Sequence, residues 1–379
     1  MKTFEKLIPL KKLLNDQLVD LFVQLTKINS ISLQERAIAD YVIELLQPLG
    51  MTIKEDDAAA KLGGNCGNLI CLPKNYDPSK SSIALCAHLD TVQPTDGIVH
   101  IIDGTTIRTN GKTILGGDDR LGLSVIVHLM REIHIKNVPH KNVLCVFTVA
   151  EELGMYGAGV VDLTPYNVEK AIVFDSAKRP GIYIKECAGC ELVTLKFFGK
   201  SSHAGIAPEE GINAISIAAK AVAQIPTGRI NQDTTFNFGV IKGGSATNVV
   251  PDLAIVECEV RSLYYKNIET QISLVKEKIE QSLNGNGKYE IETKTDFVPY
   301  VHSSDSGIVK DIERALVEAG LQPNGIRYTG GSDANVYNSK GIAAVNIGTG
   351  AQKPHSLEEF VLIEDLVKTY EVAYALICK

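Results

Sequence analysis

The sequence predicts an α/β protein in which a mostly parallel sheet is interrupted by an inserted α+β domain. Apolar, strand-like runs alternate with helical spacing in the first half, which indicates strands joined by helices that cover both faces of a sheet. Near Gly181 the pattern changes to short or alternating strands with two helices among them. After His302 helices and strands alternate again, so the first and last parts of the chain are expected to form one domain.

The elements of the first part follow from residue spacing. Apolar side chains at helical spacing predict the first helix, and they are Leu18, Leu21, Phe22, Leu25 and Ile28. Ser32 and Glu35 have the spacing of a capping box, which predicts a second helix that begins there and ends at Gly50. The remaining elements are a helix over 121–133 and strands over 82–89, 142–149 and 170–174.

The change of pattern after Gly181 sets the predicted domain bounds. Strands are predicted over 182–184, 192–198, 236–241, 254–260 and 289–294, with helices over 212–224 and 267–283. A helix over 306–319, a strand over 342–347 and a C-terminal helix follow. We therefore predict a main domain made of residues 1–186 and 302–379, with an inserted domain over 187–301.

Composition and charge restrict the kind of partner. The chain has 379 residues, enough for two domains, and its net charge of −7 argues against nucleic acid or an anionic membrane as a partner. The most apolar run, 143–150, is far too short to span a membrane, and the broken apolar stretch near the N-terminus is too short for a signal peptide. The eight cysteines are expected to be reduced thiols. We therefore expect a cytoplasmic protein whose partners are small peptides or metabolites.

His88 and Asp90 follow an apolar strand, at the position where ligands bind in open α/β sheets. Strand side chains alternate between faces, so these two side chains are expected to project to the same side of the sheet. A carboxylate two residues from an imidazole can orient that imidazole or a reacting water. The pair is therefore a candidate for a metal ligand and its supporting acid.

Two pairs of adjacent acids occur near predicted strand ends. Asp118 and Asp119 follow two glycines before a helix, and on spacing alone they are equally explained as a helix N-cap. Glu151 and Glu152 follow the strand over 142–149. Adjacent residues point apart, so one glutamate can coordinate a metal while the other contacts its water.

Together with two further residues, these acids predict a centre that holds two metal ions. Asp175 ends the next strand, and His355 lies in a loop rich in glycine and proline after a late strand. Histidines mixed with carboxylates suit zinc or its neighbours in the first transition series. Five ligand candidates are too many for one zinc with an open position, but they fit two metals about 3.5–4 Å apart that share a carboxylate.

Eight short motifs occur in an order that resembles one metallopeptidase family. They are AHLDTV, GGDDRLG, AEELG, FDS, SSHAG, GGSATNVVPD, EVRS and a late PHS. The family includes peptidase T (tripeptidase), glutamate carboxypeptidase, succinyl-diaminopimelate desuccinylase and aminoacylase. The resemblance covers nearly the whole chain, and it implies a zinc-exopeptidase-like catalytic domain with an inserted lid and dimerisation domain.

The resemblance also assigns the metal ligands. It implies that His88, Asp118 and Asp175 hold one zinc ion, while Asp118, Glu152 and His355 hold the other, with cobalt or manganese able to substitute. Asp118 matches the bridging position of the family motif. The resemblance therefore implies two zinc ions per chain.

The family's catalytic and substrate-binding residues map onto five further positions. Asp90 would orient a ligand histidine, and Glu151 would be the general base for a metal-bridged hydroxide acting as nucleophile. His203, on the inserted domain, would polarise the scissile carbonyl. Asn248 and Arg261 would grip the substrate's carboxylate. The family also implies a homodimer formed through the inserted domain, in which His203 reaches the partner's active site.

Further features indicate the branch of the family. Aspartate at position 175 resembles the aminopeptidase and tripeptidase branch, and residues 329–336 resemble a loop that peptidase T uses near its substrate. Arg120 stands where the family motif has lysine, a departure we expect to be harmless. The resemblance thus implies an aminopeptidase that acts on tripeptides. The alternatives are a deacylase of N-acyl amino acids, a carboxypeptidase, and a non-catalytic binding protein that retains the fold.

Overall fold

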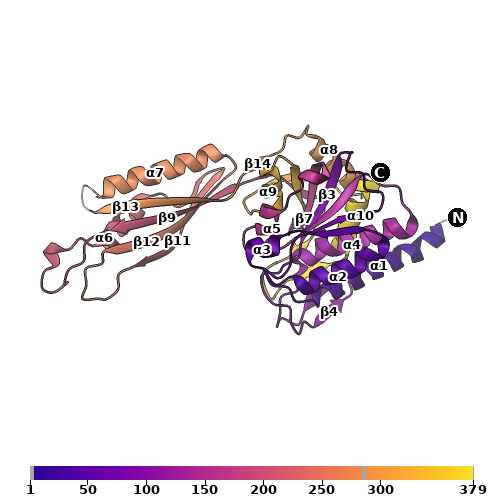
Figure 1. Cartoon of the computed structure of the whole chain (residues 1–379), viewed down its shortest axis with the longest axis horizontal. Helices are drawn as coiled ribbons and strands as arrows, with labels where there is room; N and C mark the ends of the chain where they lie inside the picture. The colour runs from indigo at the N-terminus through magenta and orange to yellow at the C-terminus, as the bar shows by residue number, and fades with distance from the viewer. Residues whose placement is uncertain (1–3, 284–286, 379) are drawn as a thin grey trace. The chain divides into compact units, whose positions relative to one another are not determined.

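The computed structural model describes residues 4–283 and 287–378, with side chains from residue 15 onward. The chain forms two compact units, and each is described here by itself (Figure 1). The first unit comprises Met1–Lys185, His302–Arg327 and Ser332–Lys379, and the second comprises Glu186–Val301 with Tyr328–Gly331. The predicted bounds had placed Tyr328–Gly331 in the main domain, whereas its contacts assign it to the second unit.

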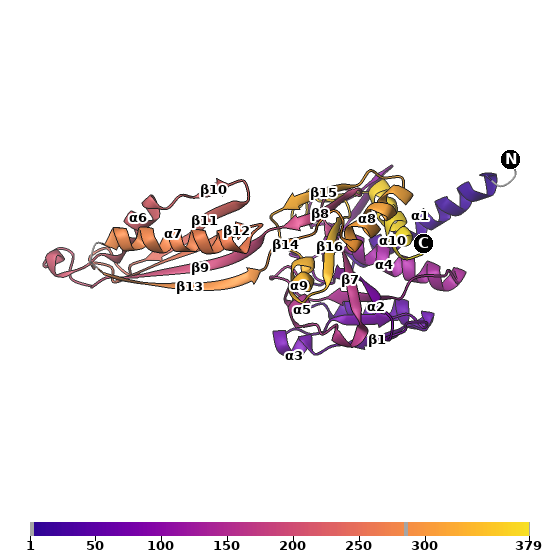
Figure 2. The ribbon, with the colours of Figure 1, turned by 90° about the horizontal axis from the view of Figure 1, so that it is seen from above.

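A sheet with a parallel centre is the core of the first unit. Its central strands run in the order β6 (Val143–Thr148), β3 (Ser82–His88), β7 (Val168–Ser176) and β16 (Ala343–Gly348), and each neighbouring pair is parallel. Figure 2 shows β16 beside β7. The predicted α/β class with an inserted domain is confirmed, because a strand from after the insertion lies within the same sheet as strands from before it. The sheet as a whole is mixed and not mostly parallel, since only its centre is parallel.

Antiparallel strands flank this parallel centre. On the β6 side lie β2 (Leu69–Leu72) and β1 (Thr52–Glu55), and on the β16 side lies β8 (Ile182–Cys187). Two more strands pair with β8. They are β15 (Asn324–Tyr328) and β14 (Tyr300–Val301), and β14 pairs with the last two residues of β8, which belong with it to the second unit. The sequence analysis missed β1, β2, β14 and β15, which are too short to show a clear apolar period.

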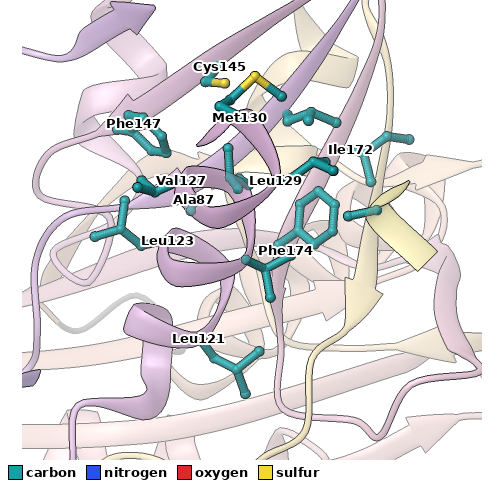
Figure 3. Packing of buried hydrophobic residues seen from close by; sticks show 14 of the residues in the cluster. Ala87, Leu121, Leu123, Val127, Leu129, Met130, Cys145, Phe147, Ile172 and Phe174 are labelled. Carbon is teal, nitrogen blue, oxygen red and sulfur yellow. The ribbon is translucent and has the colours of Figure 1, made fainter. Parts of the chain in front are cut away.

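Helix α4 (Gly117–Lys136) packs against β3 and β7 and forms the centre of the core. Leu123, Val127 and Met130 lie at helical spacing on its buried face, where Figure 3 shows them beside Phe147 and Phe174 of the sheet. Full burial of side chains of this size stabilises the fold by about 1.5–3 kcal/mol each. This packing fixes the helix whose first residues carry Asp118 and Asp119.

The other elements of the first unit surround this core. Its helices are α1 (Phe4–Thr26), α2 (Arg36–Leu46), α3 (Ala58–Leu62), α5 (Tyr156–Val160), α8 (Gly307–Glu318), α9 (Asp333–Ser339) and α10 (Ile363–Cys378), with short 3-10 turns at Gln47–Leu49 and Thr164–Tyr166. A small second sheet has the order β17 (Ala351–Gln352), β18 (Phe360–Leu362), β5 (Thr106–Thr109) and β4 (His100–Asp103). Gly50 ends the second helical segment with a φ of 73°, as predicted. In the described part of the chain, no helix is long and apolar enough to cross a membrane.

The second unit is an antiparallel sheet with two helices. Its strands run in the order β10 (Gly228–Asn231), β11 (Thr234–Gly243), β12 (Leu253–Ser262), β9 (Gly189–Phe198) and β13 (Lys288–Phe297). Helices α6 (Ala214–Gln224) and α7 (Tyr265–Leu283) pack against it, and a 3-10 turn covers Pro208–Glu210. Figure 1 shows α7 running along the strands. The two helices bury one face of the sheet through alternate residues such as Val256 and Val260.

Candidate metal centre

Acidic and histidine side chains meet at the carboxyl ends of the parallel strands. His88 is the last residue of β3, and Asp175 is the penultimate residue of β7. Glu151 and Glu152 lie in the turn that follows β6. Parallel strands present their carboxyl ends at one edge of a sheet, which is why residues far apart in sequence converge there.

Asp118 lies between two histidines and faces each with a different oxygen. Its Oδ1 is 3.1 Å from His88 Nε2, and its Oδ2 is 3.2 Å from His355 Nε2. His88 Nε2 is also 4.0 Å from Asp175 Oδ1, and His355 Nε2 is 3.0 Å from Glu152 Oε1. All five predicted ligand candidates are therefore brought together, as two groups that share Asp118.

The donor atoms of this cluster fit a cation. Each of His88, Asp118 and Glu152 offers one ligand atom, and these atoms lie within 4.8 Å of one another. Glu152 Oε1 is buried, and although His355 Nε2 lies 3.0 Å away, no well-aligned hydrogen bond reaches this oxygen from the described residues. Nitrogen and carboxylate donors at such spacing are the set that zinc prefers.

The charges of the cluster also indicate a site for cations. Burial, and then the neighbouring carboxylate Asp175, raises the pKa of Glu151 well above its ordinary value. Burial and Asp118 do the same for the pKa of Asp175. Asp118 and Glu152 raise the pKa of His355 to about 10. Because four carboxyl groups cluster around two imidazoles, the cluster lacks positive charge, which divalent cations would supply.

Asp90 connects His88 to the turn that carries the two glutamates. Its Oδ1 lies 3.3 Å from His88 Nδ1 and accepts a hydrogen bond from the Glu151 N–H at 3.0 Å. Its Oδ2 accepts from the Glu152 N–H at 3.1 Å and from the Ser32 hydroxyl at 2.6 Å. One buried carboxylate thus orients the imidazole and the glutamate backbone together.

Glu359 holds the segment that precedes and includes Asp118. Its Oε2 accepts hydrogen bonds from the N–H groups of Leu115 at 3.0 Å and Gly116 at 2.8 Å, and its Oε1 accepts from the Asp118 N–H at 3.1 Å. A Cβ on Gly117 would come within 3.0 Å of Glu359 Oε1, so the glycine lets the carboxylate approach. Sequence reasoning missed this residue, although it lies only four positions after His355.

Replacing Glu359 by alanine is expected to lower the free energy of unfolding by about 3 kcal/mol or more. The substitution leaves three N–H groups unpaired in a buried place, at about 1 kcal/mol or more each. Urea unfolding of the metal-free protein measures the change. The neighbouring Glu358→Ala is the control, because the exposed Glu358 side chain pairs with Lys353 at the surface, so its effect should be much smaller. Equal effects of the two substitutions would contradict this account of Glu359.

Arg120 is fully buried and joins three segments of the chain. It donates to the carbonyls of Leu25 at 3.3 Å and Leu89 at 3.0 Å, and to the hydroxyl of Ser30. Burial lowers the pKa of Arg120 to about 10, which still leaves the guanidinium charged at neutral pH. These contacts show that an arginine is accommodated at this position.

The substrate-binding candidates lie in the second unit. His203 and Asn248 are exposed, and their segments adjoin: His203 forms an isolated bridge with Val249, and Ala204 N donates to the Asn248 carbonyl at 2.9 Å. His203 Nδ1 accepts from the Gly205 N–H at 3.2 Å. The His203 Nε2 edge of the ring therefore stays available for a ligand.

Arg261 is held in place by its neighbours in the same unit. Glu259 accepts two hydrogen bonds from it, from Nε and Nη2, each at 3.0 Å. Arg261 Nη1 donates to the Thr329 carbonyl at 2.9 Å, and its guanidinium lies 5.6 Å from the centre of the Phe297 ring. Three of the five guanidinium N–H groups are engaged in these bonds, so two remain for a ligand.

Comparisons with family models, curated proteins and solved structures show which proteins this chain is similar to. The model of a peptidase dimerisation domain matches residues 189–286, and the model of M42 glutamyl aminopeptidase matches residues 92–179. The aminopeptidase PepT from Bacillus cereus ATCC 10987 is 34% identical, with a TM-score of 0.90 over 96% of this chain and 98% of that chain. A tripeptidase from Staphylococcus aureus is 30% identical, with a TM-score of 0.90 over 96% and 97% of the two chains. YqjE of Bacillus subtilis (strain 168), itself uncharacterised, is 33% identical over 95% of this chain and 97% of its own.

Proposed function

The chain belongs to the peptidase T-like M20 metallopeptidases, and from this membership we propose that it is a two-zinc aminopeptidase that removes the N-terminal residue of tripeptides. The observation that carries the proposal is Asp118, whose two oxygens face two different histidines. A carboxylate in that position suits a bridge between two metal ions. Relatives with solved structures include an aminopeptidase and a tripeptidase, which supports the choice of substrate.

In this proposal the metal ligands fall into two sets. His88, Asp118 and Asp175 would hold one zinc ion, and Asp118, Glu152 and His355 would hold the other. The distances within each set support the assignment, and so does the absence of a well-aligned hydrogen bond to Glu152 Oε1 in the described chain. Cobalt or manganese would serve in place of zinc, because the donor set of nitrogen and carboxylate oxygen also suits them.

The chemistry needs an activated water and a proton carrier. Two zinc ions would supply Lewis acidity that activates water at neutral pH and polarises a peptide carbonyl. Glu151 would take the proton of the attacking water and pass it to the leaving amine, as a general base and then a general acid. Asp90 would fix the ring of His88 and the backbone of Glu151, so that both keep their orientation through the reaction.

The inserted domain would recognise the substrate. Asn248 and the two remaining N–H groups of Arg261 would bind the peptide's carboxylate. The match of residues 189–286 to a dimerisation domain supports a homodimer formed through this domain. We assign residues 1–186 and 302–379 to the catalytic domain, apart from Tyr328–Gly331, which packs within the second unit, and residues 187–301 to the lid and dimerisation domain. We place the protein in the cytoplasm.

Removal of metal is expected to abolish peptide hydrolysis. EDTA or phenanthroline should bring activity to background, zinc, cobalt or manganese should restore it, and metal analysis should find about two ions per chain. The substrates are free di-, tri- and tetrapeptides, with tripeptides hydrolysed fastest and losing their first residue. Full activity of a metal-free preparation would overturn the proposal.

Matched substrates separate the alternatives within the same assay. N-acetylated tripeptides lack the free amine and should be poor substrates for an aminopeptidase, while N-acyl amino acids should not be cleaved. Preferential cleavage of N-acyl amino acids would identify a deacylase instead. Release of the last residue first would identify a carboxypeptidase.

A further inference from the structure

Side chains, not a strand ladder, hold the backbone of the turn that carries Glu151. Four consecutive N–H groups are accepted in this way: Val149 by Asn68 Oδ1 at 3.0 Å, Ala150 by Glu35 Oε1 at 2.9 Å, Glu151 by Asp90 Oδ1 at 3.0 Å and Glu152 by Asp90 Oδ2 at 3.1 Å. Each of the three acceptor side chains is fully buried. The conformation of this turn therefore depends on residues that are distant in sequence.

Ala150 has a left-handed backbone, with a φ of 51°. A residue with a Cβ rarely adopts this conformation unless its surroundings impose it. In an extended strand the neighbours Glu151 and Glu152 would point to opposite faces. The left-handed turn at Ala150 changes the direction of the chain immediately before the two glutamates.

Glu35 is the residue that precedes the first turn of α2, but its side chain does not cap that helix and is free to support the turn that carries Glu151. We expected Ser32 and Glu35 to form a capping box, and that prediction was wrong: α2 begins at Arg36, and no side chain caps its start. Ser32 donates instead to Asp90 Oδ2, while Glu35 Oε1 accepts from the N–H groups of Leu33 and Ala150, each at 2.9 Å. Both residues of the motif are thus directed toward the turn that carries Glu151.

Only one oxygen of Glu35 forms these bonds. Its Oε2 is buried and has no hydrogen-bond partner in the described chain, and burial raises the pKa of Glu35. A buried carboxyl group with an unpartnered oxygen is costly to the fold. The presence of a glutamate at position 35 is explained if its Oε1 is needed to accept the hydrogen bond from the Ala150 N–H.

We propose that Glu35 is a positioning residue for Glu151: by accepting the Ala150 N–H, it fixes the left-handed turn that directs the Glu151 carboxylate. The inference rests on the proposed role of Glu151 as general base. Glu35 itself does not contact the reacting atoms. It acts through one backbone hydrogen bond across 115 positions of sequence.

Glu35→Ala is expected to lower kcat by about 10- to 100-fold with an unchanged KM and unchanged metal content, because a small misplacement of a catalytic group has an effect of this size. Glu35→Gln keeps an oxygen at the Oε1 position and places its amide where Oε2 has no partner, so it should retain kcat within about threefold. A loss in the Gln variant equal to that in the Ala variant would overturn the proposal, since the charge would then be what matters. Glu35→Asp, whose shorter side chain withdraws the oxygen, repeats the test if the Ala variant does not fold.

A second readout does not depend on activity. Hydrogen exchange of the peptide containing residues 149–152, measured by mass spectrometry on metal-free protein, should be faster in Glu35→Ala and unchanged in Glu35→Gln. Val42→Ala is the matched control, because Val42 is buried in the helix that follows Glu35, its truncation makes a cavity, and it supplies none of the four hydrogen bonds to this turn. Unchanged exchange in Glu35→Ala, or an equal kcat loss in Val42→Ala, would refute a positioning role.

A double-mutant cycle separates failure of this inference from failure of the proposed function. In a Glu151→Gln background, Glu35→Ala should lower kcat no further, because the group it positions is already absent. Additive losses would show that Glu35 acts by another route. A normal kcat for Glu151→Gln alone would instead show that Glu151 is not the base, and exchange of the turn would still report on Glu35.

Discussion

Glu151→Gln is expected to lower kcat by about two to four orders of magnitude, the usual contribution of a general base. Glutamine has the size of glutamate but cannot accept a proton from water at neutral pH. The backbone of residue 151 should stay in place, because its N–H is held by Asp90 and not by its own side chain. Steady-state kinetics on a tripeptide measures the loss, and metal analysis should still find about two ions per chain.

Glu152→Ala is the comparison within the same acidic pair. Glu152 lies 3.0 Å from His355 Nε2, so its removal should lose metal as well as activity. The two glutamates are adjacent in sequence and receive hydrogen bonds from the same Asp90 side chain, so they differ mainly in the role of the carboxylate. Metal loss in Glu151→Gln with metal retention in Glu152→Ala would reverse our assignment.

His203→Ala is expected to lose most of its kcat while it keeps its metals and its dimer. In the proposed mechanism the imidazole polarises the scissile carbonyl, an electrostatic contribution of about 10²- to 10³-fold in comparable sites. His203 is exposed, and its Nδ1 is occupied by the Gly205 N–H, so its removal should leave the fold intact. Kinetics, metal analysis and sedimentation measure the three properties.

Complementation tests whether His203 serves the partner subunit. A heterodimer of His203→Ala with Glu151→Gln contains one site with both groups if His203 acts in the partner, and none if it acts in its own chain. Co-expression with two different tags gives the heterodimer, which should recover up to half of the activity of the unchanged dimer. No recovery in a heterodimer shown to form would exclude action across the dimer.

The position of the metal cluster could be predicted because it depends on local patterns. Apolar strands that stop at His88, before Glu151 and near Asp175 place their ends at one edge of a parallel sheet, and β3, β6 and β7 confirm those strands within one or two residues at each end. His355 has no such strand end, and only its motif indicated a role. The catalytic roles of these residues remain predictions that the experiments above test.

The supporting residues could not be predicted, because their contacts span the chain. The spacing of Ser32 and Glu35 predicts a helix cap. In the structure Ser32 donates to Asp90 instead, and Glu35 accepts from the Ala150 N–H. Glu359 shows no local pattern, since its three partners lie more than 240 positions earlier. Contacts of this kind arise from the tertiary fold, and the spacing of residues along the sequence does not predict them.

The link between Glu359 and Asp118 has a consequence for biosynthesis. The two residues are separated by 241 positions, so a ribosome needs about 10 to 50 s to reach Glu359 after Asp118 has been made. Until then, the amides that Glu359 will hold have no acceptor, and His355 has not been added. The inserted domain is complete before that moment. In the proposed two-metal centre, the site that includes His355 can therefore be completed only when synthesis of the chain is nearly finished.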